Sequence, residues 1–299
     1  MAVGNPLLEA RSLVTGFGAT QVLHGVDLVV HEGEIAGIFG LNGAGKSVTI
    51  KALAGLVPLW SGSIVLDGVA LDGVAAERRV GLGIGNVPQG RQVFPELTIE
   101  ENLRLGGALG RKKDKAAWPG RLQRAYDLFP VLAEKRRALA GTLSGGQQAS
   151  LAVARALVNE PRLLLIDEPS AGLAPLIVEE LLEVLQTVAG TGVAMVLVEQ
   201  NVAFGLRLAH TAHLMQTGRV ILSGPVDTLD EMQLAEALGI GSVLAASTGR
   251  ALGGRNPAAP PPKTPIVPHR RRGAVRQTAA DGRRVPLRAR AAADARPTP

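Results

Sequence analysis

The chain has 299 residues, of which 46% are hydrophobic, and a formal net charge of +6. Its length predicts one large domain or two small ones, and the complete absence of cysteine excludes disulfides and thiolate metal sites. No stretch approaches the roughly 20 consecutive apolar residues of a membrane-spanning helix, and the N-terminus lacks the basic and apolar regions of a secretion signal, so we expect neither membrane insertion nor export.

Apolar runs of strand length alternate with longer helical patterns along residues 1–248. The runs Ile35–Phe39, Leu163–Ile166 and Val193–Val198 each precede glycines or polar residues and then a helical segment. Because LLLI at 163–166 shows no alternation of apolar and polar residues, it favours a strand that is buried on both faces of a parallel sheet. The pattern therefore predicts an α/β fold.

GLNGAGKS at 40–47 matches the phosphate-binding pattern G-x-x-x-x-G-K-[ST] in full. It follows the strand IAGIF and precedes the helical segment VTIKALAGL, which is the context that this motif requires. Glycines let successive backbone N–H groups converge on phosphate oxygens, and the helix N-terminus adds positive potential. We expect Lys46 to reach the β- and γ-phosphates and Ser47 to supply an oxygen to Mg²⁺. A glycine-rich strand-to-helix turn with a chance lysine is the alternative.

Residues 98–140 are charged, helical in pattern and without strand-like runs. Thr98 and Glu101 form the spacing of a capping box at the start of a helix. We expect this segment to be a small helical subdomain inserted into the sheet domain.

LSGGQQASLAVARAL at 143–157 places Ser144 at a helix N-cap, ahead of two glycines and a strong helix. The segment therefore predicts a second anion-binding helix N-terminus, here without a preceding strand.

LLLIDEPSAGLAP at 163–175 supplies two carboxylates at the end of a predicted strand. Asp167 is positioned to hold Mg²⁺ directly or through water, and Glu168 is the candidate general base for water. Taken alone, Asp-Glu-Pro would suit an ordinary strand-to-turn exit with Pro175 opening a helix. The phosphate loop upstream favours the metal and base roles.

With LSGGQ, these motifs resemble the ATP-binding cassette (ABC) ATPases, in the family's order and over residues 7 to about 244. The resemblance implies a P-loop NTPase fold of ABC type, with a mainly parallel core sheet, an antiparallel β subdomain and an inserted helical subdomain. It also implies that the LSGGQ helix of one subunit caps the γ-phosphate of ATP held by its partner, in a head-to-tail dimer with two ATP molecules.

The same resemblance assigns roles to individual residues. Phe17 corresponds to the aromatic that stacks on adenine, with a core aromatic as its alternative. Gln89 corresponds to the glutamine that touches Mg²⁺ or water. Catalysis is expected from Glu168, Gln200 and Lys46, and Mg²⁺ binding from Ser47, Gln89 and Asp167. Contacts to ATP are expected from Phe17, Gly40, Asn42, Gly43, Gly45, Lys46, Ser47, Val48, Gln89, Ser144, Gly145, Gly146 and Gln147.

Two positions depart from the family pattern. Ala174 stands where many members carry aspartate, which weakens the usual contact across the dimer. Gln200, in VEQN after the strand 193–198, stands where most members carry a switch histidine, and Asn201 is expected to cap the next helix. Glutamine can donate an amide N–H to the γ-phosphate but does not titrate near neutral pH.

VEQN, GLAP and VPQGRQVFPELTIEENL together are similar to one branch, the ATP-binding subunits of branched-chain (hydrophobic) amino acid importers and their urea and amide relatives. That branch often has glutamate at the position of Gln89, so the match is incomplete. The branch implies membrane-spanning permease subunits, a second ATPase subunit in a homodimer or heterodimer, and an extracytoplasmic solute-binding protein as an indirect partner. It implies a place on the cytoplasmic face of the membrane and no specific nucleic acid.

Residues 249–299 hold twelve Lys or Arg and two Asp or Glu, whereas residues 1–248 hold twenty and twenty-four. This Pro-, Ala- and Arg-rich tail has too few large apolar residues to fold, so we expect a disordered segment after an ATPase domain at 1–248. It would be either an extension without a specific role or an arm for anionic lipid or nucleic acid. The second reading supports an alternative function, a soluble ABC ATPase acting on nucleic acid or ribosomes. A small-molecule P-loop kinase is a third possibility, which leaves LSGGQ unexplained.

Overall fold

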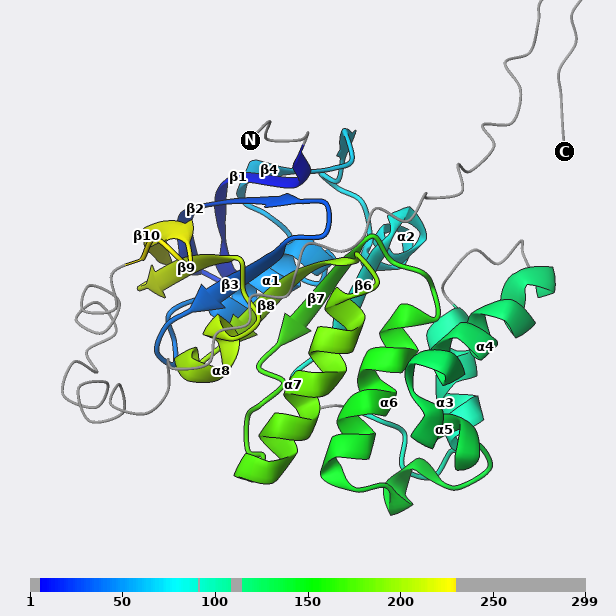
Figure 1. The fold of residues 1–299 in the computed structure, drawn as a ribbon. Coiled ribbons are helices and arrows are strands. Elements are labelled where there is room, and N and C mark those ends of the chain that lie inside the picture. The colour runs from blue at the N-terminus through cyan, green and yellow to red at the C-terminus, as the bar shows by residue number, and fades with distance from the viewer. Residues whose placement is uncertain (1–5, 91, 109–114, 230–299) are drawn as a thin grey trace, which may run out of the picture. The chain divides into compact units, whose positions relative to one another are not determined.

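The structure is a computed structural model that describes residues 6–90, 92–108 and 115–229 (Figure 1). The predicted tail at 249–299, the domain boundary at 248/249 and part of the predicted helical insertion lie outside the described residues. Within them, no helix has both the length and the apolar character needed to cross a bilayer.

One sheet is antiparallel and has the strand order β2-β1-β4-β5. Its long central strand pairs with a neighbour on each side, for example Leu8 with Val30 and with Leu66. The strands are β1 (Pro6–Phe17), β2 (Thr20–His31), β4 (Ser61–Leu66) and β5 (Val69–Ala70).

The other sheet has six strands in the order β10-β9-β3-β8-β7-β6. From β9 to β6 all neighbours are parallel, and only β10 pairs antiparallel, with β9. Its members are β3 (Ile35–Phe39), β6 (Ile84–Val87), β7 (Leu163–Asp167), β8 (Ala194–Glu199), β9 (Thr211–Gln216) and β10 (Arg219–Pro225). The predicted α/β class with a mainly parallel core sheet and an antiparallel β subdomain is confirmed.

Both faces of the parallel sheet are buried, which explains why its strands show no alternation of apolar and polar residues. In β7, Leu163 and Leu165 pack into a core that includes α1 and the antiparallel sheet, whereas Leu164 and Ile166 pack on the other face against α6 and α7. Every residue of β7 and β8 is buried. Full burial of one Leu, Ile or Val side chain contributes about 1.5–3 kcal/mol to stability. The side chains of β7 and β8 therefore fix the positions of these two strands in the sheet.

Eight α-helices are described in this part of the chain, and Figure 1 shows α1 between the two sheets and α3 to α6 grouped beside the end of the parallel sheet. The helices are α1 (Lys46–Ala54), α2 (Ala76–Leu82), α3 (Ile99–Ala108), α4 (Trp118–Leu128), α5 (Pro130–Glu134), α6 (Gly145–Leu157), α7 (Pro175–Ala189) and α8 (Val202–Leu206). Short 3₁₀ turns occupy Lys115–Ala117 and Ala140–Thr142.

The capping box predicted at the start of α3 is present. The Glu101 carboxylate accepts from the backbone N–H of Thr98 at 2.8 Å, and the Thr98 hydroxyl accepts from the N–H of Glu101 at 3.2 Å. Leu103 of α3 and Leu132 of α5 share one core with α6, α7 and the sheet. A separate helical subdomain at 98–140 stays a prediction.

Helix α7 begins without a side-chain cap. Its N-cap residue is Ala174, in an extended conformation, and Pro175 occupies the first helical position. Alanine has no side-chain oxygen that could accept from the first N–H groups of the helix, so this end lacks a contribution that an aspartate side chain would supply.

We therefore predict that Ala174→Asp stabilises the protein by about 0.5–2 kcal/mol, because the carboxylate caps α7 and complements its dipole. Thermal unfolding followed by circular dichroism should show a melting temperature a few degrees higher, at about 2–4 °C per kcal/mol for a domain of this size. Ala174→Asn should share the gain and Ala174→Val should not. Equal effects of Asn and Val would contradict the capping explanation.

Candidate functional site

The carboxyl ends of the parallel strands bring the predicted site residues to one edge of the sheet. Phe39 at the end of β3 pairs with Glu199 at the end of β8, and Asp167 at the end of β7 pairs with Val198. Gly40, Glu168 and Gln200 each directly follow one of these strands. Ligand sites in open α/β sheets lie outside the carboxyl ends of the strands, which agrees with the placement of this cluster.

The turn from β3 into α1 has the geometry of an anion cradle. Gly45 is the N-cap of α1 with a φ of +103°, and the helix has neither a side-chain cap nor an acidic residue in its first turn. A Cβ on Gly40 would come within 2.3 Å of the carbonyl oxygen of Met215. Only glycine fits this approach, and the helix N-terminus stays available to a negatively charged group.

The hairpin between β9 and β10 supports this turn. The backbone N–H of Gly218 donates to the carbonyl oxygen of Ala44 at 2.9 Å, and Met215 contacts the turn at Gly40. These two residues were not among the predicted site residues. Their sequence shows only a Thr-Gly turn, at 217–218, that is about 170 residues away from the phosphate loop, so no local pattern could have connected them.

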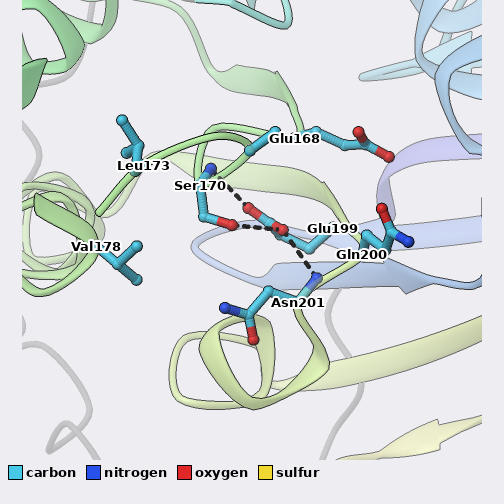
Figure 2. Close-up of a pocket in the computed structure, with 8 residues that line it drawn as sticks. Glu168, Ser170, Leu173, Val178, Glu199, Gln200 and Asn201 are labelled. Carbon is cyan, nitrogen blue, oxygen red and sulfur yellow. Dashed lines mark hydrogen bonds between the residues drawn. The ribbon is translucent and has the colours of Figure 1, made fainter. Parts of the chain in front are cut away.

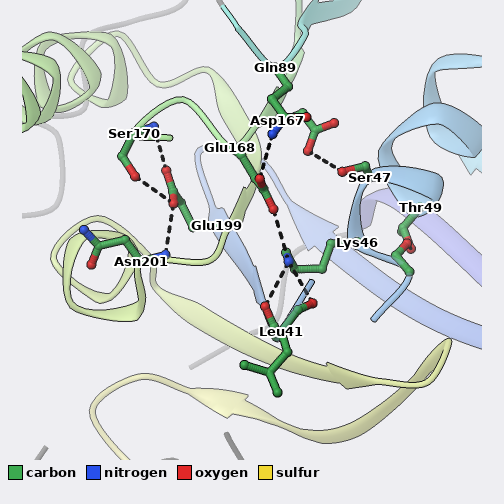
Figure 3. Close-up of polar contacts among 12 residues, drawn as sticks. Leu41, Lys46, Ser47, Thr49, Gln89, Asp167, Glu168, Ser170, Glu199 and Asn201 are labelled. Atoms are coloured by element: carbon green, nitrogen blue, oxygen red, sulfur yellow. Dashed lines mark hydrogen bonds and ion pairs between the residues drawn. The ribbon is translucent and has the colours of Figure 1, made fainter. Parts of the chain in front are cut away.

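Lys46 is the first residue of α1, and its side chain is only 3% exposed. Its ammonium group donates to the carbonyl oxygens of Gly40 at 2.9 Å and Leu41 at 3.1 Å. It also forms an ion pair with Glu168, with 3.1 Å between Nζ and Oε1 (Figure 3). The lysine thus lies with its charge at the centre of the turn, beside the candidate base.

Ser47, Asp167 and Gln89 surround the same point from three elements. The Ser47 hydroxyl donates to Oδ1 of Asp167 at 3.0 Å, and the Gln89 amide donates to Oε2 of Glu168 at 2.9 Å (Figure 3). Burial raises the pKa of Asp167, and the hydrogen bond from Ser47 opposes that rise. The structure therefore brings together five of the predicted site residues at this edge, namely Lys46, Ser47, Gln89, Asp167 and Glu168.

The side-chain oxygens of these residues fit a bound Mg²⁺. Among the described residues no group of three or more His, Cys, Asp or Glu could form an all-protein metal cage. Mg²⁺ in nucleotide sites is held by one or two carboxylates or hydroxyls together with phosphate oxygens, and Ser47 and Asp167 are such a set. Gln89 turns its amide nitrogen to Glu168, and its amide oxygen is the atom that could join this set.

Glu168 has a left-handed backbone, with a φ of +44°. This conformation costs a non-glycine residue about 1–3 kcal/mol and persists only where its surroundings hold it. Its N–H donates to the carbonyl oxygen of Val198 at 2.9 Å, and its carbonyl accepts from the N–H of Ala171 at 3.2 Å. The turn therefore aims the Glu168 side chain at Lys46, whereas Asp167 in β7 faces Ser47.

Beside Glu168 lies a hollow of about 280 Å³ whose lining includes Ser170, Glu199, Gln200 and Asn201 (Figure 2). Asn201 is the N-cap of α8 as predicted, because its side chain accepts from the N–H of Phe204 at 3.1 Å. Gln200 lines the hollow and is exposed. Glu199 is 1% exposed and binds Ser170, a role that the sequence analysis did not assign.

The remaining predicted residues lie further from this cluster. Phe17 ends β1 and is 52% exposed, so it is not a core aromatic and its face is open to a ligand. Asn42 and Gly43 are exposed in the phosphate loop, and Val48 lies in the first turn of α1.

Ser144, Gly145, Gly146 and Gln147 begin α6, apart from α1 in Figure 1. The Ser144 hydroxyl accepts from the Gln147 N–H and the Gln147 side chain accepts from the Ser144 N–H, both at 3.3 Å. This capping box holds the helix start in shape. The Gln147 side chain also accepts from the ammonium of Lys135 at 3.2 Å, which adds positive charge there.

Comparison with known proteins places these motifs in context. The ABC transporter family matches residues 23–171. The high-affinity branched-chain amino acid transport ATP-binding protein BraG of Pseudomonas aeruginosa is 41% identical over 72% of this chain and 91% of its own length. The branched-chain amino acid transport ATP-binding protein LivF of Archaeoglobus fulgidus is 35% identical over 79% and 100%. A solved ATP-binding subunit of an ABC transporter is 29% identical, with a TM-score of 0.63 over 82% and 100% of the two chains.

We predict that Lys46→Ala weakens ATP binding by roughly 100-fold or more, because the loop loses the ammonium group that we expect to bind the β- and γ-phosphates. Isothermal calorimetry with Mg²⁺-ATP checks this. Lys51→Ala, an exposed lysine in the last turn of the same helix, is the matched control and should bind within about threefold of the wild type. Tight binding by Lys46→Ala would remove the phosphate-loop assignment.

Proposed function

The chain belongs to the ABC transporter family of ATP-binding proteins, and on that basis we propose that it is the ATPase subunit of a bacterial ABC importer. ATP binding and hydrolysis follow from family membership. The cluster of Lys46, Ser47, Gln89, Asp167 and Glu168 at one sheet edge is the observation that carries the proposed site roles.

In the proposed mechanism, Lys46 and the open N-terminus of α1 bind the β- and γ-phosphates. Phe17 stacks on adenine, and Gly40, Asn42, Gly43, Gly45 and Val48 complete the loop around the triphosphate. Ser47, Asp167 and Gln89 would hold Mg²⁺, which would neutralise the charge on the phosphates.

Glu168 is the proposed general base, and its ion pair with Lys46 has a consequence for the order of events. The ion pair holds the Glu168 carboxylate against the Lys46 ammonium, with 3.1 Å between Nζ and Oε1. When phosphate oxygens of ATP accept the hydrogen bonds of the Lys46 ammonium, the Glu168 carboxylate is released from its ion pair and faces the γ-phosphate. Its Oε2 still accepts a hydrogen bond from the Gln89 amide. There the carboxylate accepts a proton from the attacking water.

Gln200 is proposed to donate a hydrogen bond from its side-chain amide to the γ-phosphate. It follows β8 and lines the same hollow as Glu168. Because the amide is uncharged, it contributes one positioned donor and no titrating proton near neutral pH. The start of α6, from Ser144 to Gln147, would face the γ-phosphate bound by a partner subunit.

The proposed assembly follows from the same roles. A site that needs Ser144 from another chain requires a second ATPase subunit, either a copy of this chain or a related one. Two membrane-spanning permease subunits would carry the solute, and the ATPase would lie on the cytoplasmic face. A solute-binding protein would act from the other side. No specific nucleic acid is proposed as a partner.

The proposed solute is a branched-chain or other hydrophobic amino acid, or a related amide or urea. BraG and LivF are named for branched-chain amino acid transport, and they support this choice. In importers of this branch the solute contacts the binding protein and the permease, so the genes that neighbour this one are the most direct guide to it.

Substitution of Gln200 tests the proposed amide contact. Gln200→Ala should lower kcat by roughly 5- to 150-fold, because a hydrogen bond to a charged group is lost, while ATP affinity changes little. Gln200→His keeps a ring N–H donor and should retain activity. Steady-state hydrolysis and calorimetry measure the two quantities, and an unchanged kcat in Gln200→Ala would return this residue to a structural role.

Glu168→Gln tests both the base and the dimer. The variant keeps size and hydrogen bonding but cannot accept the proton, so ATP should bind without turnover and an ATP-dependent dimer should accumulate. Light scattering, with the partner subunit added where its gene is known, measures the mass. Adding Ser144→Arg should abolish the dimer, because a bulky cation would occupy the phosphate position. Wild-type turnover by a Glu168→Gln monomer would contradict both roles.

A further inference from the structure

The carboxylate of Glu199 joins two turns that leave neighbouring strands. Oε1 accepts from the backbone N–H of Ser170 at 2.9 Å. Oε2 accepts from the Ser170 hydroxyl at 2.9 Å and from the backbone N–H of Asn201 at 3.2 Å. Ser170 lies in the turn after β7 and Asn201 in the turn after β8. One side chain thus holds donors from both turns.

These turns carry the two side chains that approach the γ-phosphate in the proposed function. Glu168 stands two residues before Ser170, and Gln200 stands between Glu199 and Asn201. Figure 2 shows the carboxylate of Glu199 pointing toward Ser170, whereas the side chains of Glu168 and Gln200 extend together on the other side. Neighbouring residues at the end of a strand point to opposite faces, so the inward orientation of Glu199 turns Gln200 toward Glu168.

Filling space does not account for an acidic residue at this position. Glu199 is 1% exposed, and burial raises the pKa of its carboxyl group, against the effect of the bonds from Ser170 and Asn201. Burying an ionisable group is costly unless its hydrogen bonds compensate. An apolar side chain would avoid that cost but would leave the N–H groups of Ser170 and Asn201 without this acceptor.

The proposed roles of Glu168 and Gln200 both depend on precise placement of their side chains. Glu168 has the strained φ of +44°, which the surrounding turn must maintain. Gln200 is uncharged, so its contact with a phosphate depends on the distance and angle of a single amide donor. A restraint between the two turns would serve both requirements.

We propose that Glu199 is a positioning residue that fixes the turn of Glu168 and the turn of Gln200 relative to each other for hydrolysis of the γ-phosphate. The proposal rests on the proposed roles of Glu168 and Gln200. Glu199 itself does not touch the nucleotide.

Glu199→Gln is the matched test, because the side chain keeps its size while one acceptor oxygen becomes an NH₂ donor. At least one of the three donors then loses its acceptor. In the nucleotide-free full chain, the backbone amides of Ser170 and Asn201 should exchange hydrogen at least about tenfold faster, measured by NMR. With any required partner subunit present, kcat should fall roughly 10- to 100-fold, while KM for ATP changes less than about threefold, because the contacts of Lys46 are untouched.

Two further variants separate positioning from a general loss of stability. Ser170→Ala removes one bond and leaves both backbone donors, so kcat should fall by a smaller factor, about 3- to 10-fold. In the double variant, Ser170→Ala should lower kcat of Glu199→Gln by a smaller factor than it lowers kcat of the wild type, because the two changes break one shared contact. Thr98→Ala removes the capping box of α3 and should lower the melting temperature, while kcat and the exchange of Ser170 and Asn201 stay at wild-type values.

The outcomes decide the proposal. Unchanged amide exchange in Glu199→Gln, or a kcat within twofold of the wild type, overturns it. If Glu199→Gln does not fold, Ser170→Ala decides in its place: wild-type kcat and wild-type exchange at Asn201 would overturn the proposal. Failure of the wild-type chain to hydrolyse ATP contradicts the proposed function instead, and amide exchange still reports whether Glu199 links the two turns.

Discussion

The parallel register of β3, β8 and β7 is the constraint on which the site depends. Because these strands run in the same direction and are buried on both faces, their carboxyl ends stop at one edge and cannot shift without exposing a core. A slip of one residue would reverse every side chain in β7. Asp167 would then turn away from Ser47. The geometry of the phosphate loop, the predicted metal ligands and the proposed base therefore follows from burial of Leu, Ile and Val side chains.

Electrostatics at this edge is balanced within the protein itself. Lys46 is nearly inaccessible to water, and its charge is balanced by Glu168 and by two backbone carbonyl oxygens. Removing one partner of such a buried pair is costly, about 3–5 kcal/mol in typical cases. In the proposed function, the triphosphate of ATP replaces Glu168 as the anionic partner of Lys46, so nucleotide binding and release of the proposed base are one exchange of partners.

The two glycine-rich helix starts differ in a manner that suits their separate roles. Helix α1 has Gly45 as its N-cap and no side-chain cap, so its first N–H groups stay available to an anion. Helix α6 begins with a capping box between Ser144 and Gln147, and its start is ordered without a ligand. A preformed surface of this kind suits docking onto a nucleotide that another subunit has already bound.

The sequence by itself determined the α/β class, the strands 35–39 and 163–166, the phosphate loop and the caps at Thr98, Ser144 and Asn201, because each depends on local patterns of residues. It also identified the candidate site residues by motif. Tertiary structure decided the contacts between them. The ion pair of Lys46 with Glu168 joins positions 122 residues apart, and the support of the phosphate loop by Gly218 comes from a distant hairpin. The role of Glu199 depended on where β7 and β8 end beside each other, since a strand-end carboxylate in the sequence does not reveal which turn supplies its donors.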